Sequence, residues 1–97
     1  MPVVWTRKAS EQLDSIYEYI AQDSPVYALR FVEKIIGKVD LALTQPEAGR
    51  IVPEFDQSDV REIFVGTYRV IHWARDDGIE ILAVIHGARL LPDNLGQ

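Results

Sequence analysis

The stretch YRVIHWARDDGIEILAVIHGAR, residues 68–89, decides the fold of the second half of the chain. Residues 68–74 and 79–87 are rich in β-branched, aromatic and aliphatic side chains, which favour strands. Between them, residues 75–78 read Arg-Asp-Asp-Gly, the composition of a tight hairpin turn. Residues 79–87 are apolar almost throughout, which is typical of a central strand covered on both faces. The stretch therefore predicts an antiparallel hairpin whose second strand lies inside a sheet.

Two further segments complete the predicted sheet, and a third is predicted as a loop. Residues 60–66, VREIFVG, form a strand that a tight turn joins to the hairpin. Residues 2–5, Pro-Val-Val-Trp, have the composition of a short strand. Residues 44–59 are polar and carry two prolines, so a long loop is expected there, with a short strand at 50–52 left open. The sequence thus predicts a mainly antiparallel sheet of about four strands.

Two amphipathic helices are predicted between the first strand and the loop. Thr6 suits the N-cap of the first helix, whose apolar stripe comprises Ala9, Leu13, Ile16, Tyr17 and Ile20. Ser24 suits the N-cap of the second, and Pro25 suits its first position, where no N–H is needed. Its stripe comprises Ala28, Phe31, Val32, Ile35, Val39, Ala42 and Leu43. The short turn between them predicts an antiparallel helical hairpin on one face of the sheet, an α+β fold in a single domain, residues 1–97.

Composition limits the classes of function. A chain of 97 residues suffices for one domain, and 47% hydrophobic with 26% charged residues is typical of a soluble globular protein. No apolar run approaches the ~20 residues of a membrane helix, and the first residues lack the pattern of a signal peptide. The absence of cysteine excludes disulfides and thiolate metal sites. A cytoplasmic protein with no membrane partner is expected.

The charge of the chain argues against a broad nucleic-acid interface. Ten lysines and arginines stand against fifteen acidic residues, which gives a net charge of −5. Proteins that grip RNA or DNA over a wide face are usually basic, because neutralised phosphates supply most of the affinity. Strong direct nucleic-acid binding is therefore not expected. Any such contact would be local or would be made through a protein partner.

Arg69, His86 and Arg89 are the strongest candidates for chemistry. In an antiparallel meander the start of strand 68–74 and the end of strand 79–87 lie at the same end of the sheet, so these side chains are expected to converge. Histidine transfers protons near neutral pH and arginines bind a scissile phosphate, which suits RNA cleavage. The alternative is structural: an arginine at a sheet edge commonly pairs with a carboxylate, and a histidine ending an apolar strand commonly bonds to the backbone.

Other candidates point to binding. Arg61 opens strand 60–66 and is expected at the opposite end of the sheet. Trp73 is interpreted as core, with an exposed anchor for a partner as the alternative, since Trp is enriched at binding hot spots. The acidic residues of the loop region are interpreted as solvated, or as an attraction for a basic partner segment; they are Glu54, Asp56, Asp59 and Glu62. His72 and His86 lack a third ligand at a suitable spacing, so no metal site and no cofactor are expected.

Five motifs follow one another along nearly the whole chain. They are W-x3-A-x3-L-x2-I-x2-Y-I at 5–20, SPVYALRFVEKI at 24–35, QPEAGRIVPE at 45–54, VREIFVGTYRVIHW at 60–73 and ILAVIHGAR at 81–89. Together they resemble the RelE/ParE superfamily of toxins from bacterial type II toxin–antitoxin systems. The resemblance implies the fold derived above. It also implies a small cognate antitoxin whose C-terminal segment wraps the toxin.

The superfamily has two activities: RelE-like members cleave mRNA on the ribosome, and ParE-like members act on DNA gyrase. Arg69 and Arg89 match positions that carry catalytic arginines in RelE-like members. The chain departs from that branch at Arg61 and Glu62, where RelE-like enzymes place basic residues, and no tyrosine or histidine follows Arg89. A net charge of −5 opposes entry into an RNA-lined pocket of the ribosome. The pieces P-x2-GR-x-VPE and RE resemble the ParE branch. A gyrase-directed toxin that is not itself an enzyme is therefore expected.

In this interpretation Arg61, Arg69, Trp73 and Arg89 are structural or contact gyrase or the antitoxin. Two alternatives stay open: a ribosome-dependent mRNA endonuclease using Arg69, His86 and Arg89, and a non-toxic module that only binds the antitoxin. The antitoxin is expected to add a strand beside residues 2–5 or to lay a helix between the helices and the sheet. Apolar surface on the helical hairpin also leaves a homodimer or a toxin–antitoxin hetero-oligomer open.

Overall fold

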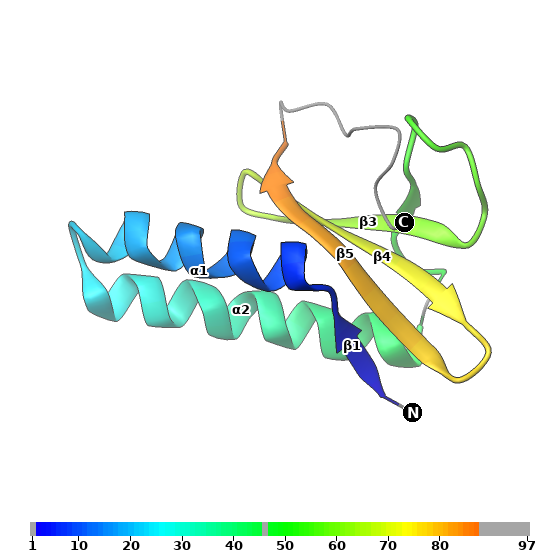
Figure 1. The fold of residues 1–97 in the computed structure, drawn as a ribbon, viewed down its shortest axis with the longest axis horizontal. Helices are drawn as coiled ribbons and strands as arrows, with labels where there is room; N and C mark the ends of the chain where they lie inside the picture. Colours follow the sequence, from blue (N-terminus) through cyan, green and yellow to red (C-terminus); the bar gives the residue numbers. More distant parts are fainter. Residues whose placement is uncertain (1, 46, 88–97) are drawn as a thin grey trace.

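The sheet is built from both ends of the chain. A computed structural model describes residues 2–45 and 47–87 (Figure 1). Its elements in chain order are β1 (Val3–Trp5), α1 (Arg7–Ala21), α2 (Pro25–Thr44), β2 (Arg50–Ile51), β3 (Val60–Val65), β4 (Tyr68–Arg75) and β5 (Gly78–His86). The strand order is β1-β5-β4-β3-β2, in which β1 runs parallel to β5 and the other pairs are antiparallel. The α+β architecture is confirmed, and the fifth strand is the short one that the sequence left open.

The helices begin where the sequence places their caps. The Thr6 hydroxyl accepts a hydrogen bond from the Ala9 N–H at 3.1 Å and donates to the Leu82 carbonyl at 3.3 Å. The Ser24 hydroxyl accepts from the Tyr27 N–H at 3.2 Å, and Pro25 occupies the first turn of α2. Each cap satisfies an amide that the helix itself leaves unpaired. Thr6 also ties the start of α1 to the centre of the sheet.

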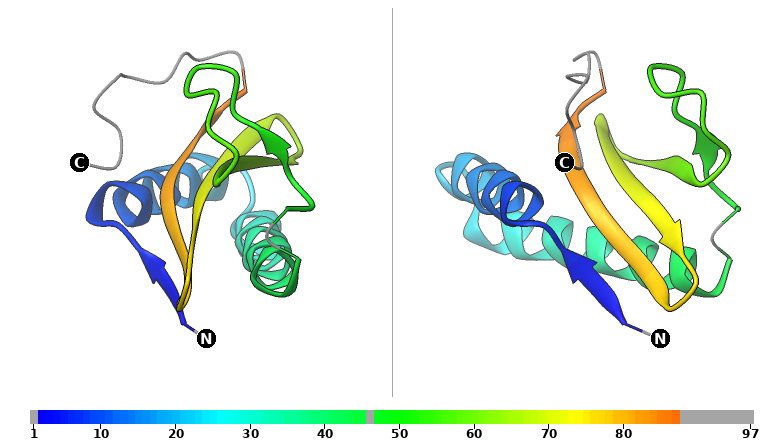
Figure 2. Two further views of the ribbon diagram at one scale, coloured as in Figure 1. Left: turned by 90° about the vertical axis from the view of Figure 1, so that its right-hand side faces the viewer. Right: turned by 45° about the vertical axis from the view of Figure 1, so that its right-hand side comes forward.

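The helical hairpin covers one face of the sheet, and the connection between β2 and β3 covers part of the other (Figure 2). The helix-side core contains Ala9, Ile16, Phe31, Ile35, Val39, Ala42, Val65, Val70, Ile79, Ile81 and Val84. The outer core contains Val52, Val60, Ile71, Leu82, Ala83 and Ile85, with Phe55 and Trp73 packed against it. Strand β5 contributes to both cores, which confirms that it is a central strand. None of the helices in the described segments is long and apolar enough to cross a membrane.

Candidate functional site

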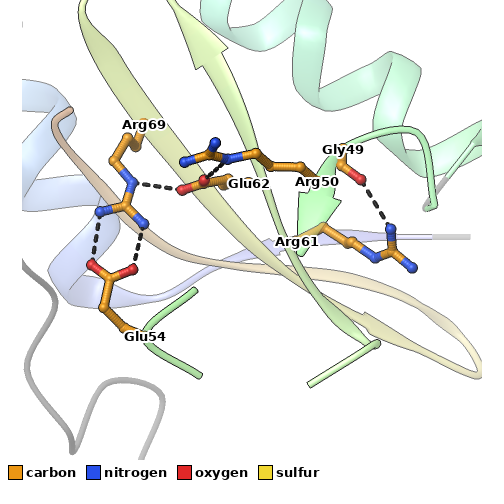
Figure 3. Close-up of polar contacts among 6 residues, drawn as sticks. All are labelled: Gly49, Arg50, Glu54, Arg61, Glu62 and Arg69. Carbon is orange, nitrogen blue, oxygen red and sulfur yellow. Dashed lines mark hydrogen bonds and ion pairs between the residues drawn. The ribbon is translucent and has the colours of Figure 1, made fainter. Parts of the chain in front are cut away.

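Arg69 lies at the start of β4 and is held by two carboxylates (Figure 3). Its Nε donates to Glu62 Oε1 at 2.6 Å, and its two terminal nitrogens donate to the two oxygens of Glu54 at 2.9 Å each. The bidentate pair with Glu54 is the strong geometry for an arginine and a carboxylate. The side chain of Arg69 is only 5% exposed. Its guanidinium therefore lies inside the protein as part of an ion-pair network.

Glu62 connects Arg69 to a second arginine. The Glu62 side chain has no exposed surface, and its Oε2 accepts a hydrogen bond from Arg50 Nε. Arg50 lies directly opposite Glu62 in the β2–β3 pairing. Two arginines and two carboxylates thus form a network without net charge on the outer face of the sheet, as buried charges require. The interpretation of Glu62 as a solvated acid is wrong, because its side chain is buried and bound by Arg69. Glu54 is also bound by Arg69, but part of its side chain remains exposed to solvent.

The electrostatics of the network follow from this geometry. The hydrogen bonds to Glu54 raise the pKa of Arg69 above its ordinary value; burial opposes the rise, and Glu62 adds to it. Attraction by the two acids therefore outweighs the cost of removing the guanidinium from water. An incoming phosphate or carboxylate would have to displace Glu54 before it reached this guanidinium.

His86 lies on the opposite face of the sheet from Arg69. It pairs with Tyr68 in the β4–β5 register, and their rings meet edge to face at a centroid distance of 5.8 Å. Tyr68 packs on the helix-side core, and both residues line a cavity of about 460 Å³ beside α1. Because successive side chains of a strand alternate between faces, Arg69 points the other way, toward Glu62. The structure does not bring Arg69 and His86 together, and Arg89 lies outside the described residues.

Arg61 donates hydrogen bonds to backbone carbonyls of the neighbouring loops. Its Nε donates to the Ser58 carbonyl at 2.9 Å, and its Nη1 donates to the Gly49 carbonyl at 3.1 Å (Figure 3). These bonds fasten the residues before β2 to the start of β3. Arg61 pairs with His72 in the sheet, whereas Arg69 lies opposite Phe64 further along the same strands. The two arginines therefore lie apart, as the sequence predicts.

Trp73 is half-buried rather than fully part of the core. Its ring packs against the outer core, and its Nε1 donates to Asp59 Oδ2 at 3.0 Å. The guanidinium of Arg75 lies 5.0 Å from the ring centroid, within the range of a cation–π contact. The exposed edge of Trp73 keeps it among the surface groups available to a partner.

Sequence reasoning missed His72 as a buried titratable group. It is fully buried in β4, and neither ring nitrogen has a hydrogen-bond partner among the described residues. Burial lowers the pKa of His72, and the nearby positive charge of Arg61 lowers it further. The only sequence signal is its place in the middle of an apolar strand. Across residues 2–45 and 47–87, no three His, Asp or Glu side chains gather closely enough to hold a metal ion.

His72→Leu is expected to stabilise the fold by roughly 1–3 kcal/mol at neutral pH, because it removes a buried polar group that forms no hydrogen bond within the described part of the chain. The lowered native pKa means that the unfolded chain takes up a proton below pH 6.5, its ordinary value, while the native state stays neutral. The stability advantage of the variant should therefore grow as the pH falls from 7 to 5. Urea denaturation at several pH values measures this. An advantage that shrinks toward acid would contradict it.

Known proteins are similar to this chain in sequence and in fold. Residues 3–91 match the family described as "ParE toxin of type II toxin-antitoxin system, parDE". Toxin RelE2 of Caulobacter vibrioides is 35% identical over 89 residues, which cover 91% of this chain and 97% of that protein. Putative toxin Y4kP of Sinorhizobium fredii is 32% identical over 91 residues, which cover 94% and 93%. A solved structure described as "Chromosomal ParDE TA system from P. aeruginosa" aligns with a TM-score of 0.71 and 27% identity, covering 89% of this chain and 95% of that one.

Proposed function

Because the chain belongs to the ParE toxin family of type II toxin–antitoxin systems, we propose that it arrests growth by inhibiting or poisoning DNA gyrase and that a cognate antitoxin neutralises it. The observation that carries the proposal is that the guanidinium of Arg69 is bound by carboxylates of the protein itself. RNA cleavage would need this arginine to reach a phosphate together with a proton-transferring group. In this protein Arg69 is bound by Glu54 and Glu62, and His86 lies on the other face of the sheet. A net charge of −5 also opposes binding to an RNA surface.

In this proposal the candidate residues have different roles. Arg61 and Arg69 hold the fold together through their bonds to loop carbonyls and carboxylates. Trp73, half-exposed beside Arg75, is the described candidate that can touch gyrase or the antitoxin directly. Arg89 keeps its candidate role in contacting one of these partners. The protein acts by binding and uses no catalytic residue of its own.

The ribosome-dependent mRNA endonuclease is the second candidate function. It is favoured by the similarity to a relative named Toxin RelE2. It would use Arg69, His86 and Arg89 around the scissile phosphate. Arg69 would then have to leave Glu54 when RNA arrives, at the cost of exposing a buried ion-pair network.

Induced expression in a bacterium without the antitoxin tests the proposal. We expect filamentous cells and an early DNA-damage response while protein synthesis continues, and recovery when the antitoxin is co-expressed. Pulse labelling of protein and DNA measures which synthesis stops first. An immediate stop in protein synthesis with intact DNA would favour the endonuclease. Normal growth would indicate a module that only binds the antitoxin.

His86→Ala is expected to leave the growth arrest unchanged within about twofold, because His86 is exposed and substitutions of exposed side chains usually have small effects. An endonuclease that uses His86 as its proton-transferring group would instead lose most of its toxicity. Colony counts after induction measure the effect. The variant's circular dichroism spectrum and thermal transition serve as the control, so that lost toxicity is not confused with lost folding.

A further inference from the structure

The outer edge of β3 is only partly paired. Strand β2 contributes two residues, which lie opposite Arg61 and Glu62, whereas β3 continues to Val65. Within the segments that the structure describes, no strand pairs with 63–65 on the side away from β4. Val60 accepts a hydrogen bond from Val52 on that side, so by strand alternation the N–H and C=O of Phe64 also point outward. An edge of this kind is open to an added strand.

A groove runs beside this edge. The end of α2 and the β2–β3 strands enclose a cavity of about 320 Å³, lined mainly by Leu41, Ala42, Ala48, Ile63 and Phe64. Two of these lining residues, Leu41 and Phe64, are 49% and 48% exposed. Apolar side chains that remain this open next to an unpaired backbone edge are suited to receiving an apolar side chain of a partner strand.

The rim of the groove is positive although the chain as a whole is acidic. Lys38 and Arg50 line it, and the Arg50 guanidinium lies 5.2 Å from the centroid of the Phe64 ring. The acid in the lining, Glu62, is fully buried and bound by Arg69 and Arg50. The lining therefore holds two cations and one carboxylate, and because Arg50 is bound to Glu62 the excess positive charge is that of Lys38. A ligand carboxylate is favoured near Lys38.

We propose that this groove binds an extended, acidic segment of a protein partner. The segment pairs antiparallel with β3 through the outward N–H and C=O of Phe64 and continues the line of β2. It places one aliphatic or aromatic side chain between Leu41 and Phe64 and one carboxylate near Lys38. A second copy of this chain is the less suitable occupant, because pairing two such edges would bring Lys38 and Arg50 close to the same cations of the other copy.

A selection from phage-displayed random nonapeptides tests the proposal without any assumption about gyrase or ribosomes. We expect the purified protein to enrich peptides in which apolar and acidic residues alternate. A synthetic copy of the most enriched peptide should slow hydrogen exchange of the Phe64 amide. Lys38→Glu should weaken its binding about fivefold or more, the upper range of one exposed ion pair. Lys8→Glu makes the same charge change on α1, away from the groove, and should leave binding unchanged.

Several results would overturn the inference. They are the absence of enriched peptides, a basic or non-alternating consensus, equal binding by Lys38→Glu and Lys8→Glu, or protection of amides away from β3. Self-association of the free protein with protection at Phe64 would instead assign the edge to a second copy. All of these readouts are independent of toxicity, so they distinguish failure of this inference from failure of the gyrase proposal.

Discussion

Glu62→Gln is expected to destabilise the fold by about 3–5 kcal/mol, because it breaks a buried ion-pair network by removing the charge of one of its members. The Glu62 side chain is completely buried between Arg69 and Arg50. Without its charge, Arg69 is balanced by Glu54 alone. Small domains have only about 5–15 kcal/mol of stability, so the variant should lose a large part of it. Urea denaturation followed by circular dichroism measures the change.

Two carboxylates of the same loop region provide controls for this prediction. Glu54→Gln should cost less than Glu62→Gln, because the Glu54 side chain is 20% exposed and water can solvate part of the loss. Asp56→Asn makes the same charge change at an exposed position whose φ of 51° Asn tolerates, and it should be nearly neutral. Equal stability of Glu62→Gln and Asp56→Asn would contradict the network described for Arg69.

The same network changes how toxicity data for Arg69 must be interpreted. Arg69→Ala leaves Glu62 buried without its buried positive partner, so it is expected to lower the amount of folded protein. A loss of toxicity in that variant would not identify a catalytic arginine. Toxicity should therefore be compared between the variant and the wild type at equal amounts of folded protein. This comparison separates a loss of folding from a loss of a catalytic group.

Gly78→Ala is expected to destabilise the fold by roughly 2–4 kcal/mol, because it combines backbone strain with a clash. Gly78 has a φ of 151°, and a Cβ there would lie 2.1 Å from the Pro2 carbonyl oxygen. This oxygen accepts the Ile79 N–H at 3.2 Å, which begins the parallel pairing of β1 with β5. The substitution should therefore detach β1 as well as strain the β4–β5 turn. Thermal unfolding and amide exchange at Ile79 measure both effects.

Gly37→Ala is the matched control. Gly37 lies in α2 with open space around the position of a Cβ, and alanine is favoured over glycine in a helix by roughly 1 kcal/mol. We expect this variant to be more stable than the wild type. If the two glycine substitutions changed stability in the same direction and by the same amount, the contact between β1 and the β4–β5 turn would be refuted.

Local patterns predicted most of the fold. The hydroxyl caps at Thr6 and Ser24, the tight turn between β4 and β5 and the apolar run of β5 each depend on a few neighbouring residues. The sequence therefore predicts them directly. The alternation of side chains along the strands also argued against the ribonuclease site of Arg69 and His86. Tyr68 and His86 form a cross-strand pair, which places their neighbour Arg69 on the other face.

The ion-pair network was not predictable from local sequence. Glu62 follows Arg61 in the chain, and such a pair at a strand start is typical of a solvated edge. Its burial depends on Arg69 from the next strand and on Arg50 from a two-residue strand, contacts that only the tertiary fold creates. The ring of His72, which has no hydrogen-bond partner within residues 2–45 and 47–87, was equally unpredictable. No local pattern distinguishes it from a core histidine that forms hydrogen bonds.

The most direct test of the proposed function combines purified protein with gyrase and supercoiled plasmid, beside a parallel reaction of ribosomes translating mRNA. We predict inhibited supercoiling or trapped, cleaved plasmid in the first reaction and intact mRNA in the second. That result would make Arg69 part of the scaffold and His86 dispensable. Cleaved mRNA with unaffected gyrase would contradict the proposal and assign Arg69, His86 and Arg89 to a ribonuclease site.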